Sequence, residues 1–237
     1  NQSVVVDTYV YSFLYFGIQV IDMSNPSAPE VAGEIYYPVR CHDLVPDGDF
    51  LYAANSYDGI AIFDISNPIQ PVLAAEIEMP SGYAYPVAYD ISIENDRAYV
   101  SGSSVYMILD ISDPYNPSVL HHFEPNLHAY SSAVADGFAY MITSYGVSSY
   151  DMSDLQNPVH IHDRACGAID IVIRDKIAYV GCRDDSLVML NLNSPSLLNI
   201  IATLVDTTQA RNFNDVELYG DYLYLMAYNG INIVDVS

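Results

Sequence analysis

The stretch Ile60-Ala-Ile-Phe-Asp-Ile-Ser-Asn-Pro-Ile-Gln-Pro71 joins a short apolar run to an Asp-Ile-Ser-Asn-Pro turn, and similar segments recur along the chain. The apolar run is typical of a β-strand, and Asn-Pro is typical of the turn that ends one. An Asp or Asn at such a turn accepts backbone N–H bonds from two residues on, so we interpret it as a structural anchor rather than a catalytic group. Successive anchors are 40 to 46 residues apart; they are Asp22, Asp64, Asp110, Asp151, Asn191 and Asp235.

A tyrosine runs in step with the anchors, 11 or 12 residues before each of them; these are Tyr11, Tyr52, Tyr99, Tyr140, Tyr179 and Tyr224. Each repeat reads as four short strands joined by hairpins, which the third repeat shows at 90–94, 97–101, 105–109 and 118–123. Four antiparallel strands in about forty residues are the size of a propeller blade, and six repeats are enough to close a ring. The sequence therefore predicts an all-β fold, a six-bladed β-propeller with four-stranded antiparallel blades.

The propeller is expected to be a single domain over residues 1–237, with repeats at about 2–36, 37–82, 83–123, 124–162, 163–206 and 207–237. Repeat one has a short first strand at 2–6, whereas repeat six stops after its third strand. Either the last blade lacks its outer strand, or the natural protein continues; we favour a fragment of a longer chain.

The strand and its Asp-Ile-Ser-Asn-Pro-x-x-Pro tail, as in Ile60 to Pro71, resemble the LVIVD repeat of bacterial and archaeal secreted and cell-surface proteins. The resemblance covers essentially the whole chain, although the fifth repeat has Asn191 at the anchor and lacks the second proline. It implies a propeller in an extracellular or cell-surface setting. It supplies no catalytic residues.

The charge composition of the chain limits the classes of molecule that it can bind. Seven Lys and Arg stand against thirty Asp and Glu, which gives a net charge of −23. Nucleic acid is excluded as a partner because phosphate binding needs a basic surface. No apolar run is long enough to span a bilayer, so we expect no membrane insertion in this segment. A monomer, or a module of a longer chain, is expected.

The candidate site lies in the loops that join one blade to the next and in those between the second and third strands, because these connections gather on one face of a propeller. Four of the seven basic residues fall in these loops, together with Tyr, His and Asn side chains. The candidate ligand-binding residues are Arg40, His42, Tyr85, Tyr89, His128, Tyr130, Arg164, Arg183, Arg211 and Asn214. Arginine forks bind carboxylate or sulfate, and tyrosine rings stack on a sugar or peptide. Alternatively, each arginine pairs with a neighbouring acid such as Asp43, Asp163, Asp184 or Asp215.

Three other patterns each have two interpretations. Aspartates that recur at the start of a first strand either hold Ca²⁺ or accept backbone amides; they are Asp43, Asp90, Asp170 and Asp215. His160 and His162 either bind a metal or form a solvated pair on an outer strand. Cys166 and Cys182 form one disulfide or stay free, and the third cysteine, Cys41, is left over. No cofactor is expected beyond the calcium that these aspartates would take.

The leading functional prediction is a non-enzymatic extracellular module that binds a protein or a carbohydrate through these loops. One alternative is a ligand-free spacer within a larger surface protein. Another is a propeller enzyme of the glycoside hydrolase or lactonase type, since sialidases also place arginines and tyrosines on one face. This chain, however, has no tryptophan, no Ser-x-Asp-x-Gly-x-x-Trp turn and no Gly-x-Ser-x-Gly elbow.

Overall fold

The computed structural model describes the chain except for residues 1, 15–16, 38–39, 185, 206–212 and 228–229. The described residues form strands and turns, and no helix long and apolar enough to cross a membrane is found among them. The chain divides into two compact units, Asn1–Pro125 (unit 1) and Asn126–Ser237 (unit 2). The expectation of a single domain stays a prediction.

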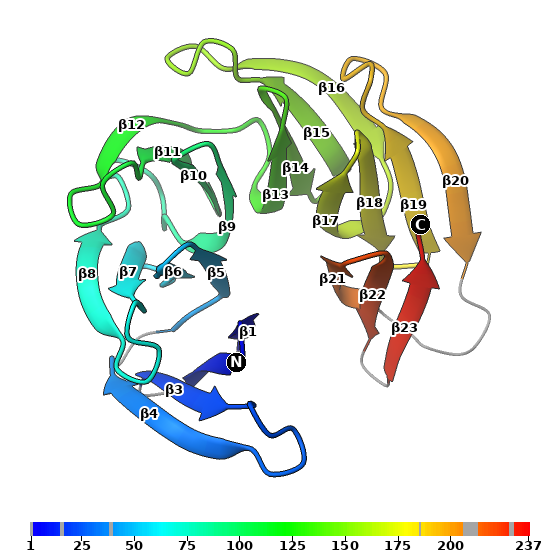
Figure 1. Ribbon diagram of the computed structural model, residues 1–237. Helices are drawn as coiled ribbons and strands as arrows, with labels where there is room; N and C mark the ends of the chain where they lie inside the picture. The colour runs from blue at the N-terminus through cyan, green and yellow to red at the C-terminus, as the bar shows by residue number, and fades with distance from the viewer. Residues whose placement is uncertain (1, 15–16, 38–39, 185, 206–212, 228–229) are drawn as a thin grey trace. The chain divides into compact units, whose positions relative to one another are not determined.

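Unit 1 consists of three four-stranded antiparallel sheets in which the strands follow chain order (Figure 1). Their strands are β1 (Gln2–Val6), β2 (Tyr9–Leu14), β3 (Gly17–Asp22), β4 (Glu30–Tyr36); β5 (Asp43–Asp47), β6 (Phe50–Ala54), β7 (Ile60–Asp64), β8 (Val72–Ile77); and β9 (Ala88–Glu94), β10 (Arg97–Gly102), β11 (Tyr106–Asp110), β12 (Ser118–Phe123). The four strands predicted in the third repeat are confirmed to within two residues at each end.

Unit 2 consists of two four-stranded sheets and one three-stranded sheet. Their strands are β13 (Ala129–Ala135), β14 (Phe138–Thr143), β15 (Gly146–Asp151), β16 (Val159–Ala165); β17 (Ala168–Arg174), β18 (Ile177–Cys182), β19 (Ser186–Asn191), β20 (Asn199–Val205); and β21 (Phe213–Tyr219), β22 (Tyr222–Ala227), β23 (Gly230–Asp235). The sixth repeat thus contributes three described strands, as its sequence predicts.

The anchor turn has the predicted hydrogen bond in all six repeats. Asp64 Oδ1 accepts the backbone N–H of Ser66 at 2.8 Å, and Asn191 Oδ1 accepts that of Asn193 at the same distance. The other four anchors make the same bond two residues on. In each four-stranded sheet a β-turn follows this bond between the third and fourth strands, such as the one closed by Gln70 N–H to Asn67 O at 3.0 Å.

The glycine that opens several third strands is required by close packing. Gly59 has φ +86°, and a Cβ there would lie 2.0 Å from the carbonyl oxygen of Ile77 on β8. Gly146 has φ +147°, and its Cβ would lie 2.1 Å from the carbonyl oxygen of Arg164. Any other residue would push the fourth strand away from the third.

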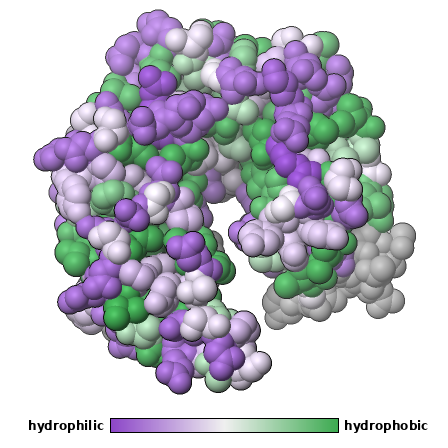
Figure 2. Space-filling view, in the orientation of Figure 1, coloured by the Kyte–Doolittle hydropathy of each residue, from purple (hydrophilic) through white to green (hydrophobic). Residues whose placement is uncertain are grey.

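The core lies between neighbouring sheets of each unit. In unit 1 one buried cluster joins Ile62 of β7 to Val100 of β10, and another joins Phe13 of β2 to Leu51 of β6. In unit 2 the corresponding clusters join the fourth sheet to the fifth and the fifth to the sixth. Central strands such as β10 are therefore buried almost throughout, whereas fourth strands such as β20 and the third strand of the sixth sheet, β23, are mostly exposed. Figure 2 shows hydrophilic and hydrophobic residues mixed over the visible surface of each unit.

Candidate functional site

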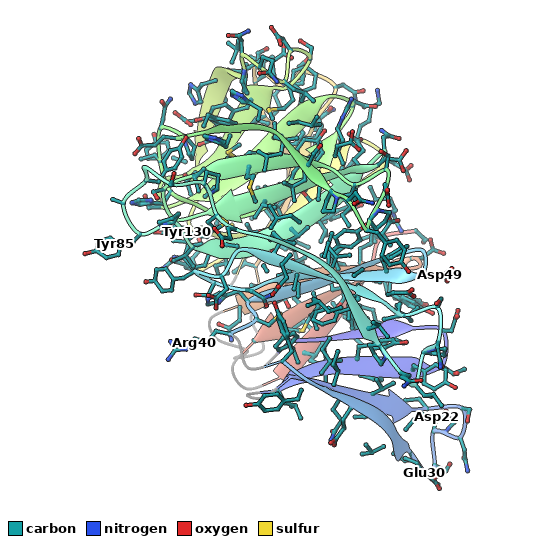
Figure 3. The ribbon with its side chains drawn as sticks, turned by 90° about the vertical axis from the view of Figure 1, so that its left-hand side faces the viewer. Asp22, Glu30, Arg40, Asp49, Tyr85 and Tyr130 are labelled. Carbon is teal, nitrogen blue, oxygen red and sulfur yellow. The ribbon has the colours of Figure 1, made fainter. Side chains whose placement is uncertain are left out.

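Antiparallel pairing gives each sheet two ends with different connections. We call the end that carries the links between repeats and the links between second and third strands the loop end, and the opposite end the turn end. Figure 3 shows Arg40 and Tyr85 of unit 1 on one side and Asp22, Glu30 and Asp49 of the same unit on the other. The loop-end residues are thus separated from the acidic turns, as the sequence predicts for unit 1.

The loop end of unit 1 brings together a histidine and a tyrosine. The rings of His42 and Tyr89 meet edge to face, with centroids 5.4 Å apart. Partial burial and, next, the charge of Arg40 lower the pKa of His42. A neutral imidazole is therefore favoured beside the arginine.

A hydroxyl fixes the loop that carries Tyr85. Ser103 Oγ donates to the Tyr85 carbonyl oxygen at 2.5 Å and accepts the backbone N–H of Val87 at 3.2 Å. Tyr85 has φ +56°, and its side chain is 79% exposed. The backbone is thus held by polar contacts while the ring is left in solvent.

In unit 2 the structure exposes four predicted site residues, which are His128, Tyr130, Arg183 and Asn214. Arg164 differs from them: it is half-buried, and its Nε donates to the carbonyl oxygen of Leu198 at 3.0 Å. That bond links β16 to the residue that precedes the fourth strand of the next sheet, so Arg164 has a structural partner. Arg211 lies outside the described residues.

The acids proposed as arginine partners are engaged elsewhere. Asp43 accepts the backbone N–H of Leu44 at 2.9 Å and that of Ile91 at 3.0 Å. Asp184 Oδ1 accepts the hydroxyl of Ser186 at 2.6 Å. Within the described part of the chain, no ion pair involves Arg40 or Arg183.

Two of the four strand-start aspartates, Asp43 and Asp170, accept backbone amides. Asp170 Oδ2 accepts the backbone N–H of Val216 at 2.9 Å, and its Oδ1 accepts the hydroxyl of Ser131 at 2.7 Å. Burial and the neighbouring Asp170 raise the pKa of Asp215 to about 8. Among the described residues there is no group of three or more His, Cys, Asp or Glu side chains that could hold a metal ion.

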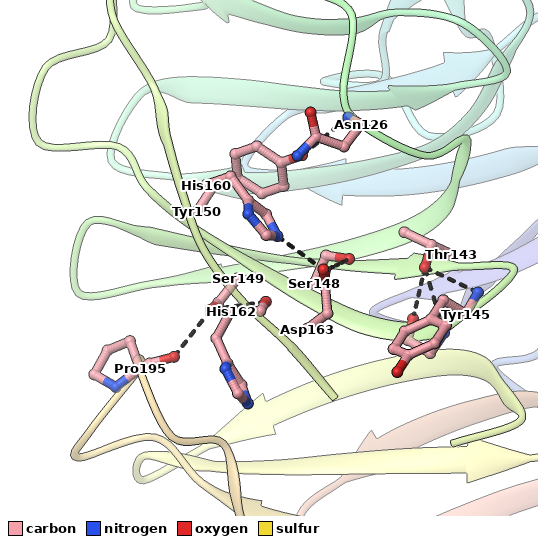
Figure 4. Close-up of polar contacts among 11 residues, drawn as sticks. Asn126, Thr143, Tyr145, Ser148, Ser149, Tyr150, His160, His162, Asp163 and Pro195 are labelled. Atoms are coloured by element: carbon pink, nitrogen blue, oxygen red, sulfur yellow. Dashed lines mark hydrogen bonds and ion pairs between the residues drawn. The ribbon is translucent and has the colours of Figure 1, made fainter. Parts of the chain in front are cut away.

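A Ser-Asp-His chain in the fourth sheet was not foreseen from the sequence. Asp163 Oδ1 accepts the hydroxyl of Ser148 at 2.6 Å and contacts His160 Nε2 at 2.9 Å (Figure 4). Burial opposes ionisation of Asp163, but the hydrogen bonds from Ser148 and His160 and the nearby imidazoles together lower its pKa. The signal in the sequence is a serine at a third-strand position where the second and third repeats have Ala61 and Met107.

This chain of contacts is not a nucleophilic triad. In such a triad the imidazole lies between the hydroxyl and the carboxylate, so that it can take the proton of the nucleophile. Here the carboxylate of Asp163 lies between Ser148 and His160. The ring of His162 points away from that of His160 in Figure 4, so the two imidazoles do not converge on a common point.

Comparison with solved structures gives the class of protein. The chain is similar to the computationally designed Ika8 protein, with a TM-score of 0.70 and 10% identity, over 98% of this chain and 70% of that one. It is also similar to BamB from Moraxella catarrhalis, with a TM-score of 0.69 and 12% identity, over the same shares of the two chains. At these identities the likeness shows the fold alone, a β-propeller. The chain's own sheets give it six blades, the last of them with three described strands.

The family follows from the repeat. The LVIVD repeat matches residues 5–36, 41–78, 87–123 and 210–237, which together make up more than half of the chain. The chain therefore belongs to the LVIVD-repeat family. A search of curated proteins finds no match.

Proposed function

We propose that this propeller is a non-enzymatic extracellular binding module that takes carboxylated or sulfated ligands, carried by a glycan or by a protein, at the loop ends of its sheets. The observation that carries the proposal is that Arg40 and Arg183 are exposed and make no ion pair with any described residue. The chain has thirty acids and seven basic residues, so carboxylates are abundant, yet among the described arginines only Arg174 makes an ion pair.

Two cations at the turn end of unit 2 have a different role. Arg174 Nη1 donates to the carbonyl oxygen of Gly220 at 2.6 Å and lies 3.6 Å from Asp221 Oδ1. Lys176 Nζ lies 3.2 Å from Asp136 Oδ2. These contacts connect turns of neighbouring repeats and explain the two residues structurally. No comparable contact explains Arg40 or Arg183.

The chemistry of the loop end suits an anionic ligand. A guanidinium that remains in water retains its five donors for a planar carboxylate or sulfate, which it binds in a two-pronged fashion. The exposed ring of Tyr85 in unit 1 and that of Tyr130, 41% exposed in unit 2, offer flat surfaces for a sugar ring or a peptide plane. A ligand-free spacer would be favoured if every arginine had an internal acid, which is not the pattern of Arg40 and Arg183.

The test is a screen of acidic and neutral glycans, together with candidate surface proteins, against the wild-type chain and against Arg40→Ala and Arg183→Ala. Arg97→Ala and Lys176→Ala are the matched controls, because both remove a cation from the turn end. We expect acidic ligands to be lost with the loop-end variants and kept with the controls. Equal binding by all variants would rule out this site, and a ligand without anionic groups would rule out the proposed chemistry.

A further inference from the structure

Cys166 and Cys182 are held beside each other at the loop end of the fifth sheet. Cys166 lies between β16 and β17, and Cys182 is the last residue of β18. Ala168 on β17 is paired with Cys182 on β18. Directly beyond this pair, the backbone N–H of Arg183 donates to the carbonyl oxygen of Gly167 at 2.8 Å. The Ala168 N–H also donates to the Cys166 carbonyl oxygen at 2.7 Å, which turns the chain so that the Cys166 thiol reaches the core cluster of Cys182.

The two thiols differ in exposure and in charge. Cys182 is 1% exposed, whereas Cys166 is only partly buried and has exposed neighbours at Ala165 and Gly167. The hydrogen bond between the two side chains is the main reason why the pKa of Cys166 is lowered to about 7, and the backbone N–H groups of Ala168 and Val147 and the charge of Arg164 act in the same direction. The same bond and burial raise the pKa of Cys182. The Cys182 Sγ also lies 3.7 Å from the carbonyl oxygen of Val180.

We propose that Cys166 and Cys182 form a dithiol site that undergoes reversible exchange with a low-molecular-weight disulfide. Cys166 is the attacking group because it is the reachable thiol and its sulfur lies among hydrogen-bond donors. Cys182 is the resolving group because it is buried in contact with Cys166. This site is independent of the ligand proposed for the arginines.

The exchange balances without any other reactant. The Cys166 thiolate attacks one sulfur of the small disulfide, which forms a mixed disulfide and releases one small thiolate. Cys182 gives its proton to that thiolate, and its sulfur then attacks Cys166 Sγ and releases the second small thiolate, which takes a proton from water. The protein loses two thiol hydrogens and gains one S–S bond, while the small disulfide is reduced to two thiols.

Cys41 is the contrasting cysteine of the same chain. Its Sγ donates to the carbonyl oxygen of Asp43 at 3.0 Å, and burial, followed by the charge of Asp43, raises its pKa. Removing Cys41 by Cys41→Ser isolates the pair without touching unit 2. Cys41→Ser is therefore the background for the test.

The experiment treats the folded Cys41→Ser protein with glutathione disulfide at pH 7 and measures its intact mass and its peptide map. We expect the loss of two hydrogens, a peptide link between Cys166 and Cys182, and recovery of both thiols with a small thiol reductant. In Cys41→Ser/Cys182→Ser we expect a glutathionyl group that stays on Cys166. In Cys41→Ser/Cys166→Ser we expect no adduct.

Two results would overturn the proposal. One is a Cys41→Ser protein that keeps both thiols, or that stops at a stable glutathione adduct, although its circular dichroism shows a folded chain. The other is a Cys166 alkylation rate whose pH midpoint is unchanged by Cys182→Ala, since the thiol donor would then have no influence on Cys166. We expect that substitution to move the midpoint upward by about one pH unit, because the donor is lost.

Discussion

Asp170 Oδ2 accepts a hydrogen bond from the backbone N–H of Val216 at 2.9 Å, and so connects the first strand of the fifth repeat to the first strand of the sixth. In unit 1, Asp43 makes the same link to Ile91 at 3.0 Å. Asp43 and Asp170 both lie near the start of a first strand. The donor in each link comes directly after the aspartate at the same position of the next repeat: Ile91 follows Asp90, and Val216 follows Asp215. Asp43 and Asp170 therefore join neighbouring sheets, which gives these two positions a structural role.

Removal of one such link should destabilise unit 1. Asp43→Ala leaves the amides of Leu44 and Ile91 without their acceptor, and we expect a loss of roughly 1–3 kcal/mol in the free energy of unfolding. Urea unfolding followed by circular dichroism measures it. Asp47→Ala, at the exposed turn end of the same strand, is the control and should change the midpoint little. Equal midpoints for both variants would show that the link contributes nothing.

The pairing of Asp215 with Asp170 should make the stability of the chain depend on pH. The pKa of Asp215 is raised from 3.8 to about 8, so between these values the folded chain holds a proton that the unfolded chain has lost. The free energy of unfolding contributed by this group is then highest below pH 4 and falls as the pH rises to about 8.

Asp215→Asn keeps a hydrogen-bond donor but cannot ionise. We expect thermal unfolding scans between pH 5 and 8 to show a smaller decrease in Tm for this variant than for the wild-type chain, with the largest gain for the variant at pH 8. Parallel pH profiles for the two proteins would contradict the assignment of the proton to this pair.

The anchor turns should accept an amide in place of a carboxylate. Asp151 Oδ1 accepts the backbone N–H of Ser153 at 2.8 Å, and the fifth repeat makes the same bond with Asn191. We therefore expect Asp151→Asn to keep the wild-type Tm near neutral pH and Asp151→Ala to lower it by a few degrees, since only the alanine removes the acceptor.

Acid should lower the stability of the wild-type chain toward that of Asp151→Ala and below that of Asp151→Asn. The backbone bond from Ser153 lowers the pKa of Asp151, so its stabilising effect is present above the ordinary carboxyl pKa and is lost as the pH falls through the lowered value. An asparagine does not titrate, so Asp151→Asn should be the more stable protein in acid. A Tm for Asp151→Asn as low as that of Asp151→Ala at pH 7 would show that charge, not geometry, matters.

Tyr11, the first of the repeated tyrosines, connects two neighbouring sheets. Its hydroxyl donates to the carbonyl oxygen of Pro68, in the anchor turn of the next repeat, at 3.1 Å. Burial, with smaller contributions from Tyr9 and Asp7, raises the pKa of Tyr11 to about 12, so the donor stays protonated at any physiological pH. Tyr11→Phe should lower the free energy of unfolding by about 1 kcal/mol.

The control for that substitution is Tyr57→Phe, because the Tyr57 side chain is 62% exposed in unit 1. Differential scanning calorimetry of both variants measures the difference. If Tyr11→Phe matches the Tyr57→Phe protein, the hydroxyl of Tyr11 adds no stability and the tyrosine is retained for packing alone.

Local rules explain why the fold was predictable from the sequence. The anchor, the glycine of the third strand and the tyrosine each act within one repeat or on the next, so a period of about forty residues was enough to place the strands. The side-chain contacts at the loop ends and in the fourth sheet are not set by the repeat in this way. Whether Arg164 bonds to the carbonyl of Leu198, or Asp163 bonds to Ser148, depends on how side chains lie across sheets and strands, which the repeat pattern does not encode.

The arginine-rich loop end could be predicted only in part. The sequence located Arg40 and Arg183 in the correct connections, but not whether the surrounding acids were available to them. One interpretation had the arginines bind a ligand, and the other paired them with acids such as Asp43 and Asp184. In the structure Asp43 accepts two backbone amides, and Asp184 accepts the hydroxyl of Ser186. Arg164 shows the limit of the prediction, because its guanidinium is partly used inside the fold.

The most direct test of the binding module is an equilibrium titration with an acidic ligand selected by the screen, performed at two salt concentrations. The account predicts that Arg40→Ala or Arg183→Ala weakens binding about tenfold or more and flattens its salt dependence, because a charged hydrogen bond is lost, while Lys176→Ala binds like the wild-type chain. Wild-type affinity and salt dependence in both loop-end variants would contradict it.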